Sequence, residues 1–307
     1  MELRHLRYFI AVAETLHFAQ AAEQLGISPP TLTVQIQEIE RTLQARLFNR
    51  SKRAVALTSA GALFLAQARA TLQQYDQAVN IGRRAGRGEL GRIEVGYVGS
   101  AAYSGILQQQ IRLFRTRWPE VYVHARELPM RLLPQWLEEG KVDLAMARCP
   151  MLLPASLQTH ILLRDPFCLA LPGEHPLAAA HGRIKPHQLS REKFIVPEQD
   201  LGTREVARRG KFVPLSVESP GSLMAVLTQV SLGAGVAVVP VVVTEIVGLP
   251  NLVFKPLSGG AIISEVAALF RRDEKSPTVN NFIAQIRQTA PLSRPEPASR
   301  RTAGPQA

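Results

Sequence analysis

Apolar residues follow two different patterns along this chain of 307 residues. Up to about residue 85 they recur at helical spacings, which predicts a set of helices. From about residue 92 onward, short apolar runs alternate with helical stretches, a pattern typical of an α/β domain. The sequence therefore predicts an all-helical N-terminal part followed by a larger α/β part, and the length allows two or three domains.

Three short helices are expected within the first 45 residues. The first has apolar residues at i, i+3, i+4 and i+7, and the second, residues 19–25, ends at Gly26. Ser28 can cap the third helix, because its side chain can accept a hydrogen bond from a free backbone N–H, and Pro29 suits the first helical position. The short turn before Ser28 predicts a helix-turn-helix, whose last helix can enter the major groove of DNA.

The face of this third helix that should point to solvent carries little charge. The opposite stripe, expected to be buried, consists of Leu32, Ile36, Ile39 and Leu43. A solvated helix would show Lys and Glu on its outer face, whereas Thr and Gln can hydrogen-bond base edges and Pro and Val can contact the thymine methyl group. The outer face is therefore a candidate for reading DNA sequence.

A basic run follows this helix. Arg46, Arg50, Lys52 and Arg53 occur within eight residues that contain no acid, so the run can contact phosphates or form a solvated basic loop. Together the helix and the run give the expected DNA contacts, which are Ser28, Pro30, Thr31, Thr33, Val34, Gln35, Gln37, Arg50 and Arg53.

A long helix is expected over residues 58–85. Its apolar residues step by three and four, the heptad pattern of a two-helix coiled coil, so dimerisation is favoured over packing on the chain's own core. The seam consists of Leu65, Ala68, Leu72, Tyr75 and Val79. A hinge is expected to follow, with glycines at 82, 86, 88 and 91.

The formal net charge is +11, and the first 92 residues hold 12 Lys/Arg against 7 Asp/Glu. Positive charge is thus about twice as dense there as in the rest of the chain, which favours a polyanion partner at the N-terminal end or a solubilising surface. The hydrophobic fraction of 46% excludes a disordered chain, and two cysteines exclude a disulfide scaffold and a four-cysteine zinc site.

Several function classes do not fit the sequence. The first 18 residues carry charges that a signal peptide's apolar core excludes, and no apolar stretch reaches membrane-spanning length, so a cytoplasmic protein without membrane contact is expected. The motifs of phosphate loops, nucleophile elbows and zinc proteases are absent. His175, His181 and His187 have no common metal-ligand spacing. We therefore expect neither an enzyme nor a metal or cofactor site.

Short motifs resemble the LysR-type transcriptional regulators, in particular the branch that controls aromatic degradation. Those resembling the family's DNA-binding domain are residues 6–9 (LRYF), 21–25 (AAEQL), 28–30 (SPP), 46–50 (RLFNR) and 57–61 (LTSAG). Those resembling its effector domain are residues 93–100 (IEVGYVGS), 140–145 (GKVDLA) and 233–240 (GAGVAVVP).

The resemblance implies a domain plan. Residues 1–58 would form a winged helix-turn-helix with its wing at 50–57, residues 59–91 a linker helix and hinge, and residues 92–290 a two-lobed α/β effector domain like a periplasmic binding protein. The first lobe would comprise residues 92–162 and 268–290 and the second residues 163–267. Strands at Leu162–Asp165 and Ala267–Phe270 would cross between the lobes, and residues 291–307 would be a disordered tail.

The resemblance also implies a ligand-responsive, sequence-specific regulator of transcription. Its partners would be double-stranded DNA, a small-molecule effector and further copies of itself, as a linker-helix dimer and a tetramer, with RNA polymerase as a further candidate. Pro29 and Val34 stand where the family often has Gln and Arg, so the operator sequence cannot be inferred from relatives. Gln44 replaces a usual glycine before the wing.

The effector would bind between the lobes. Ser100 follows a strand and opens a helix, and Arg148 ends another strand, so the pair resembles positions that hold a carboxylated effector. The alternative makes Ser100 a helix cap and Arg148 part of an intramolecular salt bridge. Met130, Pro197 and Thr203 are further candidates, and Met130 replaces a frequent hydroxyl residue.

Two other functions stay open on the sequence alone. A thiol-based redox regulator would use Cys149 and Cys168. A sequence-indifferent architectural DNA binder would account for the charge and the helix-turn-helix but not for the large α/β domain.

Overall fold

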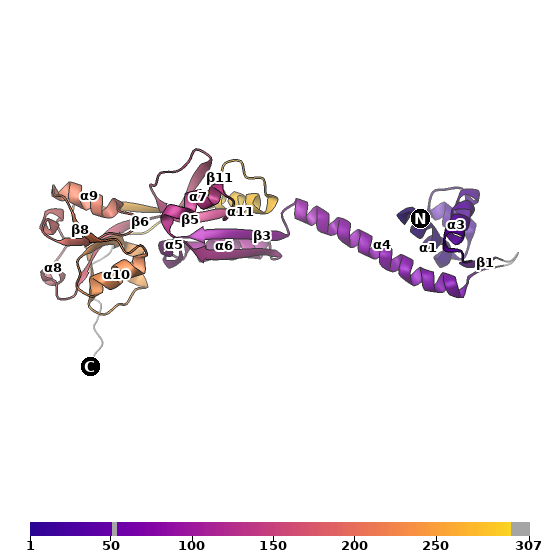
Figure 1. Ribbon diagram of the computed structural model, residues 1–307, viewed down its shortest axis with the longest axis horizontal. Coiled ribbons are helices and arrows are strands. Elements are labelled where there is room, and N and C mark those ends of the chain that lie inside the picture. The colour runs from indigo at the N-terminus through magenta and orange to yellow at the C-terminus, as the bar shows by residue number, and fades with distance from the viewer. Residues whose placement is uncertain (51–53, 296–307) are drawn as a thin grey trace. The chain divides into compact units, whose positions relative to one another are not determined.

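The computed structural model describes residues 1–50 and 54–295 (Figure 1). The chain divides into two compact units, Met1–Arg84 and Ala85–Ala307. Each unit has its own hydrophobic core. None of the described helices combines the length and apolarity of a membrane span.

The first unit contains the predicted helix-turn-helix and wing. Its elements are α1 (Leu3–Thr15), α2 (Phe18–Gln24), α3 (Pro29–Leu43), the antiparallel strands β1 (Phe48–Arg50) and β2 (Val55–Leu57), and α4 (Ser59–Gly86). Gly26 takes a φ of +64° in the turn between α2 and α3, a conformation that suits glycine. Ser28 caps α3 as expected, because its Oγ accepts a hydrogen bond from the N–H of Thr31 at 3.3 Å.

Phenylalanine rings join the wing and the long helix to the helix-turn-helix. The ring of Phe9 on α1 lies 5.3 Å from that of Phe48 on β1 and 4.9 Å from that of Phe64 on α4. Gly61 lets α4 approach the wing, since a Cβ there would lie 2.1 Å from the Leu47 carbonyl oxygen. The unit is therefore one packed body that includes the start of α4.

The long helix divides into two functional halves. Leu65, Ala68 and Leu72 from its predicted seam pack into the core of the first unit, so the alternative of packing on the chain's own core holds for this half. Tyr75 and Val79 lie outside that core, and Tyr75 is 41% exposed. The second half of the seam is thus more open to a partner helix than the first, with Val79 half-buried and the Arg7 guanidinium 6.0 Å from the ring centroid of Tyr75.

The observed bounds of the helix agree with the range of residues 58–85 expected from the sequence. It includes Gly82 and ends at Gly86, so the connection to the second unit begins after residue 86. Of the four glycines expected in the hinge, Gly82 and Gly86 thus belong to the helix, because glycine lowers helix propensity without preventing a helix.

The second unit is built on a mixed sheet in the order β10-β6-β11-β5-β3-β4, with β9 and β12 also paired to β6. The strands of this sheet are β3 (Gly91–Tyr97), β4 (Val121–Glu127), β5 (Leu144–Cys149), β6 (Leu157–Pro172), β9 (Ala237–Pro240), β10 (Leu252–Pro256), β11 (Ile263–Arg271) and β12 (Leu292–Ser293). The separate pair of parallel strands is β7 (Lys193–Ile195) and β8 (Leu215–Glu218).

Helices surround these strands in two lobes (Figure 1). The helices of lobe I are α5 (Gly99–Tyr103), α6 (Ile106–Arg117), η1 (Met130–Leu132), α7 (Leu133–Glu138) and α11 (Pro277–Gln288). Those of lobe II are α8 (Pro176–Ala179), η2 (Pro186–Leu189), α9 (Leu201–Gly210), α10 (Leu223–Ser231) and η3 (Val241–Glu245).

The strand β6 joins the lobes. It pairs with β11 as far as Pro166, and from Phe167 onward with β9 and β10. The change of partners comes slightly later than the lobe boundary expected at residues 162–163. The whole of β11 belongs to the lobe I sheet, because its register with β6 begins at Ile263, so the boundary expected at 267–268 is corrected as well.

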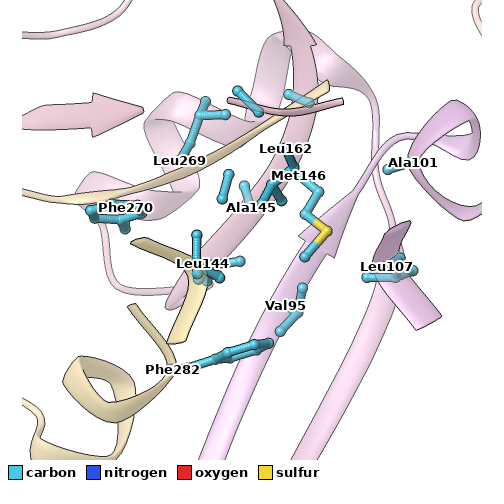
Figure 2. Packing of buried hydrophobic residues seen from close by; sticks show 14 of the residues in the cluster. Val95, Ala101, Leu107, Leu144, Ala145, Met146, Leu162, Leu269, Phe270 and Phe282 are labelled. Carbon is cyan, nitrogen blue, oxygen red and sulfur yellow. The ribbon is translucent and has the colours of Figure 1, made fainter. Parts of the chain in front are cut away.

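Lobe I has a continuous apolar core between the sheet and its helices (Figure 2). Leu144 and Met146 of β5 are fully buried, as are Leu269 of β11 and Phe282 of α11. The core anchors β3 and β5, so it positions Arg148 near the end of β5 and Ser100 in α5 just after β3.

The C-terminal tail begins later than expected. Leu292–Ser293 form β12, paired parallel to Leu163 and Arg164 of β6. Arg294 forms an ion pair with Glu245 and donates a hydrogen bond to the Ser104 carbonyl oxygen. The start of the segment expected to be disordered from residue 291 is therefore part of the effector domain, and residues 296–307 lie outside the described residues.

The turn before the wing generates a prediction about stability. Gln44 ends α3 with a φ of +50°, so it keeps the turn that a glycine would form, and its left-handed conformation costs roughly 1 kcal/mol. We expect Gln44→Gly to raise the free energy of unfolding of the first unit by up to about 1 kcal/mol. Urea denaturation followed by far-UV circular dichroism measures the change.

The matched control is Gln67→Gly, an exposed position inside α4. There the substitution should lower stability by about 1 kcal/mol, because glycine is unfavourable in a helix interior. Equal destabilisation by both substitutions would contradict a strained turn at Gln44.

Candidate functional sites

The outer face of α3 is exposed and uncharged, as the sequence predicts. Pro30, Thr31, Val34 and Gln37 are all exposed, and Val34 is 56% exposed despite its apolar side chain. Thr33 is half-buried, and its hydroxyl donates a hydrogen bond of 2.9 Å to the Pro29 carbonyl oxygen. Its lone pairs remain able to accept a hydrogen bond from a base.

Two other candidates use their polar groups within the unit. The Ser28 hydroxyl caps α3 and lies 2.7 Å from the hydroxyl of Thr31. Gln35 turns toward α1, with its Oε1 2.9 Å from Nε2 of His5. Because Nδ1 of His5 accepts from the N–H of Glu2, Nε2 is the donor. Gln35 thus joins α3 to α1. The sequence pattern instead predicts that its side chain contacts DNA.

Sequence reasoning missed Glu40, which links α3 to the wing. Its Oε1 accepts from the N–H groups of Leu47 at 2.8 Å and Phe48 at 3.2 Å, and its Oε2 pairs with Arg50 at 3.3 Å. The Arg50 guanidinium also lies 4.7 Å from the ring centroid of Phe18. The expected phosphate contact Arg50 is therefore held in a fixed orientation, while Arg53 lies outside the described residues.

A cavity of about 390 Å³ lies between the two lobes of the effector domain. Four of the five effector candidates line it, namely Ser100, Met130, Arg148 and Pro197. Thr203 does not line it. It lies on α9 with 2% exposure, and its hydroxyl has no hydrogen-bond partner among the described residues.

Arg148 is the centre of a buried polar network, so the salt-bridge alternative holds for it. Its guanidinium forms a bidentate ion pair with Asp165, which is fully buried. Its Nε donates to the Ser100 hydroxyl at 3.0 Å, and its Nη1 donates to the Ser264 hydroxyl at 2.9 Å. Ser100 is not the side-chain cap of α5, which has Val98 at its N-cap.

Lobe II is connected to this network through Gln199. Its Nε2 donates to the Cys149 carbonyl oxygen at 3.0 Å, and its Oε1 accepts from the Ser264 hydroxyl at 3.1 Å. Next to it, Glu198 accepts a hydrogen bond of 2.8 Å from the N–H of Met130 in lobe I. The cavity wall thus contains direct hydrogen bonds between the lobes, which a bound molecule can strengthen or replace.

The two cysteines are both reduced and buried. Burial, with the nearby charge of Glu265, raises the pKa of the Cys149 thiol to about 11. Burial and the charge of Asp165 also raise the pKa of the Cys168 thiol. Since the thiolate is the reactive form, these surroundings disfavour a thiol-based sensor.

No group of three His, Cys, Asp or Glu side chains in residues 1–50 and 54–295 is arranged to hold a metal ion. His175, one of the three evenly spaced histidines, caps the start of α8. Its Nδ1 accepts a hydrogen bond from the N–H of Leu177, and its Nε2 pairs with Glu192.

Comparisons with known proteins match both parts of the chain. A family model described as "Bacterial regulatory helix-turn-helix protein, lysR family" matches residues 3–62, and one described as "LysR substrate binding domain" matches residues 86–291. The HTH-type transcriptional regulator YnfL of Escherichia coli is 34% identical over 289 residues, covering 92% of this chain and 96% of the relative. AlsR of Bacillus subtilis is 32% identical, covering 92% and 94%.

A solved structure is also similar over nearly the whole chain. Full-length CbnR complexed with its target DNA matches with a TM-score of 0.77 and 26% sequence identity, covering 94% of this chain and 99% of that one.

The buried network predicts a large effect of removing one charge. Asp165→Asn leaves Arg148 buried without a counter-ion, so we expect the free energy of unfolding of the effector domain to fall by about 3 kcal/mol or more. Urea denaturation followed by tryptophan fluorescence measures it, since Trp118 and Trp136 both lie in this domain.

Glu265→Gln is the matched control. It breaks the neighbouring ion pair between Arg164 and Glu265, whose side chains are 45% and 27% exposed. The expected loss is about 1 kcal/mol or less. Similar losses in the two variants would show that burial does not set the strength of the Arg148–Asp165 pair.

The cysteine surroundings predict slow thiol chemistry. A rise in the pKa of Cys149 from 9.0 to about 11 lowers its thiolate fraction at neutral pH about a hundredfold. We expect a thiol-specific disulfide reagent to label the native protein at least about a hundredfold more slowly than the urea-unfolded chain. Rapid labelling of the native protein, with a peroxide-induced change in DNA binding, would restore the redox alternative.

Proposed function

The chain belongs to the LysR family of transcriptional regulators, and from this premise we propose how its described parts divide the work. The protein is a ligand-responsive, DNA-binding regulator of transcription with an N-terminal helix-turn-helix and a two-lobed α/β effector domain. Members of the family are transcriptional regulators, not enzymes, and this chain acts in the cytoplasm by binding rather than by catalysis.

The exposed, uncharged face of α3 carries the DNA-reading part of the proposal. Pro30, Thr31, Thr33, Val34 and Gln37 offer hydrogen-bonding and methyl-contacting groups at the surface, and α1 and the wing hold the helix in place through Gln35 and Glu40. Arg50 at the end of β1 binds a phosphate, and Arg53, which lies outside the described residues, is proposed as a second phosphate contact. The match to CbnR bound to its target DNA supports this use of the domain.

The second half of α4 supports dimerisation. Tyr75 and Val79 continue the heptad seam beyond the core of the first unit, and exposed apolar seams are the usual contact surfaces of paired helices. Two such dimers form a tetramer that binds two DNA sites and bends the DNA between them.

The cavity between the lobes is the effector site. A ligand there contacts Ser100, Arg148 and Met130 of lobe I together with Pro197 of lobe II, and it lies beside the hydrogen bonds of Glu198 and Gln199 that join the lobes. Its binding changes the angle between the lobes, the spacing of the dimers, the DNA bend and the access of RNA polymerase. A purely architectural DNA binder leaves this cavity without a role.

Thr33→Ala tests the proposal. In competition between the DNA upstream of the protein's own gene and random DNA, we expect this variant to weaken specific binding by about 1 kcal/mol, or roughly fivefold, and to leave non-specific binding unchanged.

Thr42→Ala is the matched control, because Thr42 lies on the same helix and donates the same kind of hydrogen bond, to the Glu38 carbonyl oxygen. It should change neither binding mode. Equal weakening of specific and non-specific binding by Thr33→Ala would make Thr33 structural, and equal binding of both DNAs by the unaltered protein would favour the architectural alternative.

A further inference from the structure

The cavity between the lobes has an excess of negative charge. Three charged side chains line it in the described part of the chain, Glu127, Arg148 and Glu198. The positive charge of Arg148 is compensated by Asp165. Neither Glu127 nor Glu198, both of which are exposed residues at the cavity, forms an ion pair with any residue in the described ranges, so two carboxylates face the cavity without an ion-pair partner.

Glu127 brings its charge to the cavity from lobe I. It ends β4, and a Cβ on Gly99 would lie 2.9 Å from its Oε1, so the carboxylate lies directly over the backbone at the start of α5. Its charge also contributes, after burial, to the raised pKa of the neighbouring Tyr103. A side chain at position 99 would require the Glu127 carboxylate to shift from this position.

Glu198 brings the second charge from lobe II. Its Oε2 accepts the hydrogen bond from the Met130 N–H at 2.8 Å, which leaves its other carboxylate oxygen available. Because Met130 follows Glu127 by three residues, the two carboxylates reach neighbouring segments of the cavity wall from opposite lobes.

The remaining wall is largely apolar. Leu128, Met130, Phe167 and Leu223 line it together with several prolines. A molecule that fills the cavity must therefore match an apolar surface and two carboxylates at the same time.

We propose that the effector is a small organic amine, whose cationic group is held by Glu127 and Glu198 and whose apolar body lies against Phe167 and Leu223. This inference rests on the proposed function and names the ligand class of its effector site. The ammonium group donates hydrogen bonds to carboxylates of both lobes, so its binding joins the lobes directly.

A carboxylate effector, expected from the sequence, fits this cavity less well. To pair with Arg148 it would have to displace Asp165, which would then remain fully buried without a counter-ion. It would also bring a third negative charge to a cavity that already has two uncompensated ones. The buried salt bridge thus changes the ligand preference that Arg148 alone would indicate.

Matched probes test the proposal. Isothermal titration of the full chain would compare phenethylamine, phenethyl alcohol and phenylacetate, and the same three head groups on isobutyl and cyclohexyl bodies. We expect at least one amine to bind, about tenfold or more tightly than its carboxylate counterpart, with the alcohol between them. Tighter or equal binding of the carboxylates, or no binding of any amine, would overturn the proposal.

The double variant Glu127→Gln/Glu198→Gln assigns the preference to the two carboxylates. It should lose the preference for amines, whereas Glu174→Gln, on the exposed turn after β6, should keep it. An amine preference that survives in the double variant would overturn the role of these residues.

The same preparations are scored for preferential binding to the upstream DNA. Specific DNA binding without an amine preference contradicts only the ligand class. If the unaltered protein does not prefer the upstream DNA over random DNA, the result contradicts the proposed function itself.

Discussion

The ion pair between Arg148 and Asp165 is the interaction on which the effector domain depends. A buried charge is tolerated only when it is paired and its remaining hydrogen-bonding groups are satisfied. Here Ser100 and Ser264 complete the bonding of Arg148, so the pair joins β5, β6, β11 and the start of α5 at one point. Since β6 changes strand partners just after Asp165, this point is also where the two lobes meet.

The same constraint shapes the cavity. Gln199 extends the network into lobe II through Ser264, and Glu198 contacts lobe I beside it. The cavity therefore lies against the hydrogen bonds that set the lobe arrangement. Because Asp165 already neutralises Arg148, the carboxylates of Glu127 and Glu198 determine the net charge that a ligand meets. One buried pair thus fixes the geometry of the junction and its ligand preference together.

Local patterns in the sequence predicted much of this architecture. Periodicity, the Ser28 cap and the Gly26 turn predicted α1, α2 and α3, because those signals act within a few residues. Strand ends placed Ser100 and Arg148 at the cavity. The partners of Arg148 could not be predicted, since Asp165 and Ser264 reach it only through strand pairing across long sequence separations. The same reason hid the pairing of β12 with β6. The Glu40 contacts with the wing are close in sequence but depend on how the turn after α3 directs the chain, which residue types alone do not specify.

The most direct test of the account is whether the arrangement of the lobes alone changes the complex with DNA. A Met130→Cys/Glu198→Cys variant, joined across the cavity with a short bifunctional maleimide, would fix the lobes in contact without any ligand, and the native Cys149 and Cys168 are buried against the reagent. DNase I footprints on the upstream DNA would then be compared with and without the cross-link. The account predicts a footprint of different length after cross-linking, and identical footprints would contradict it.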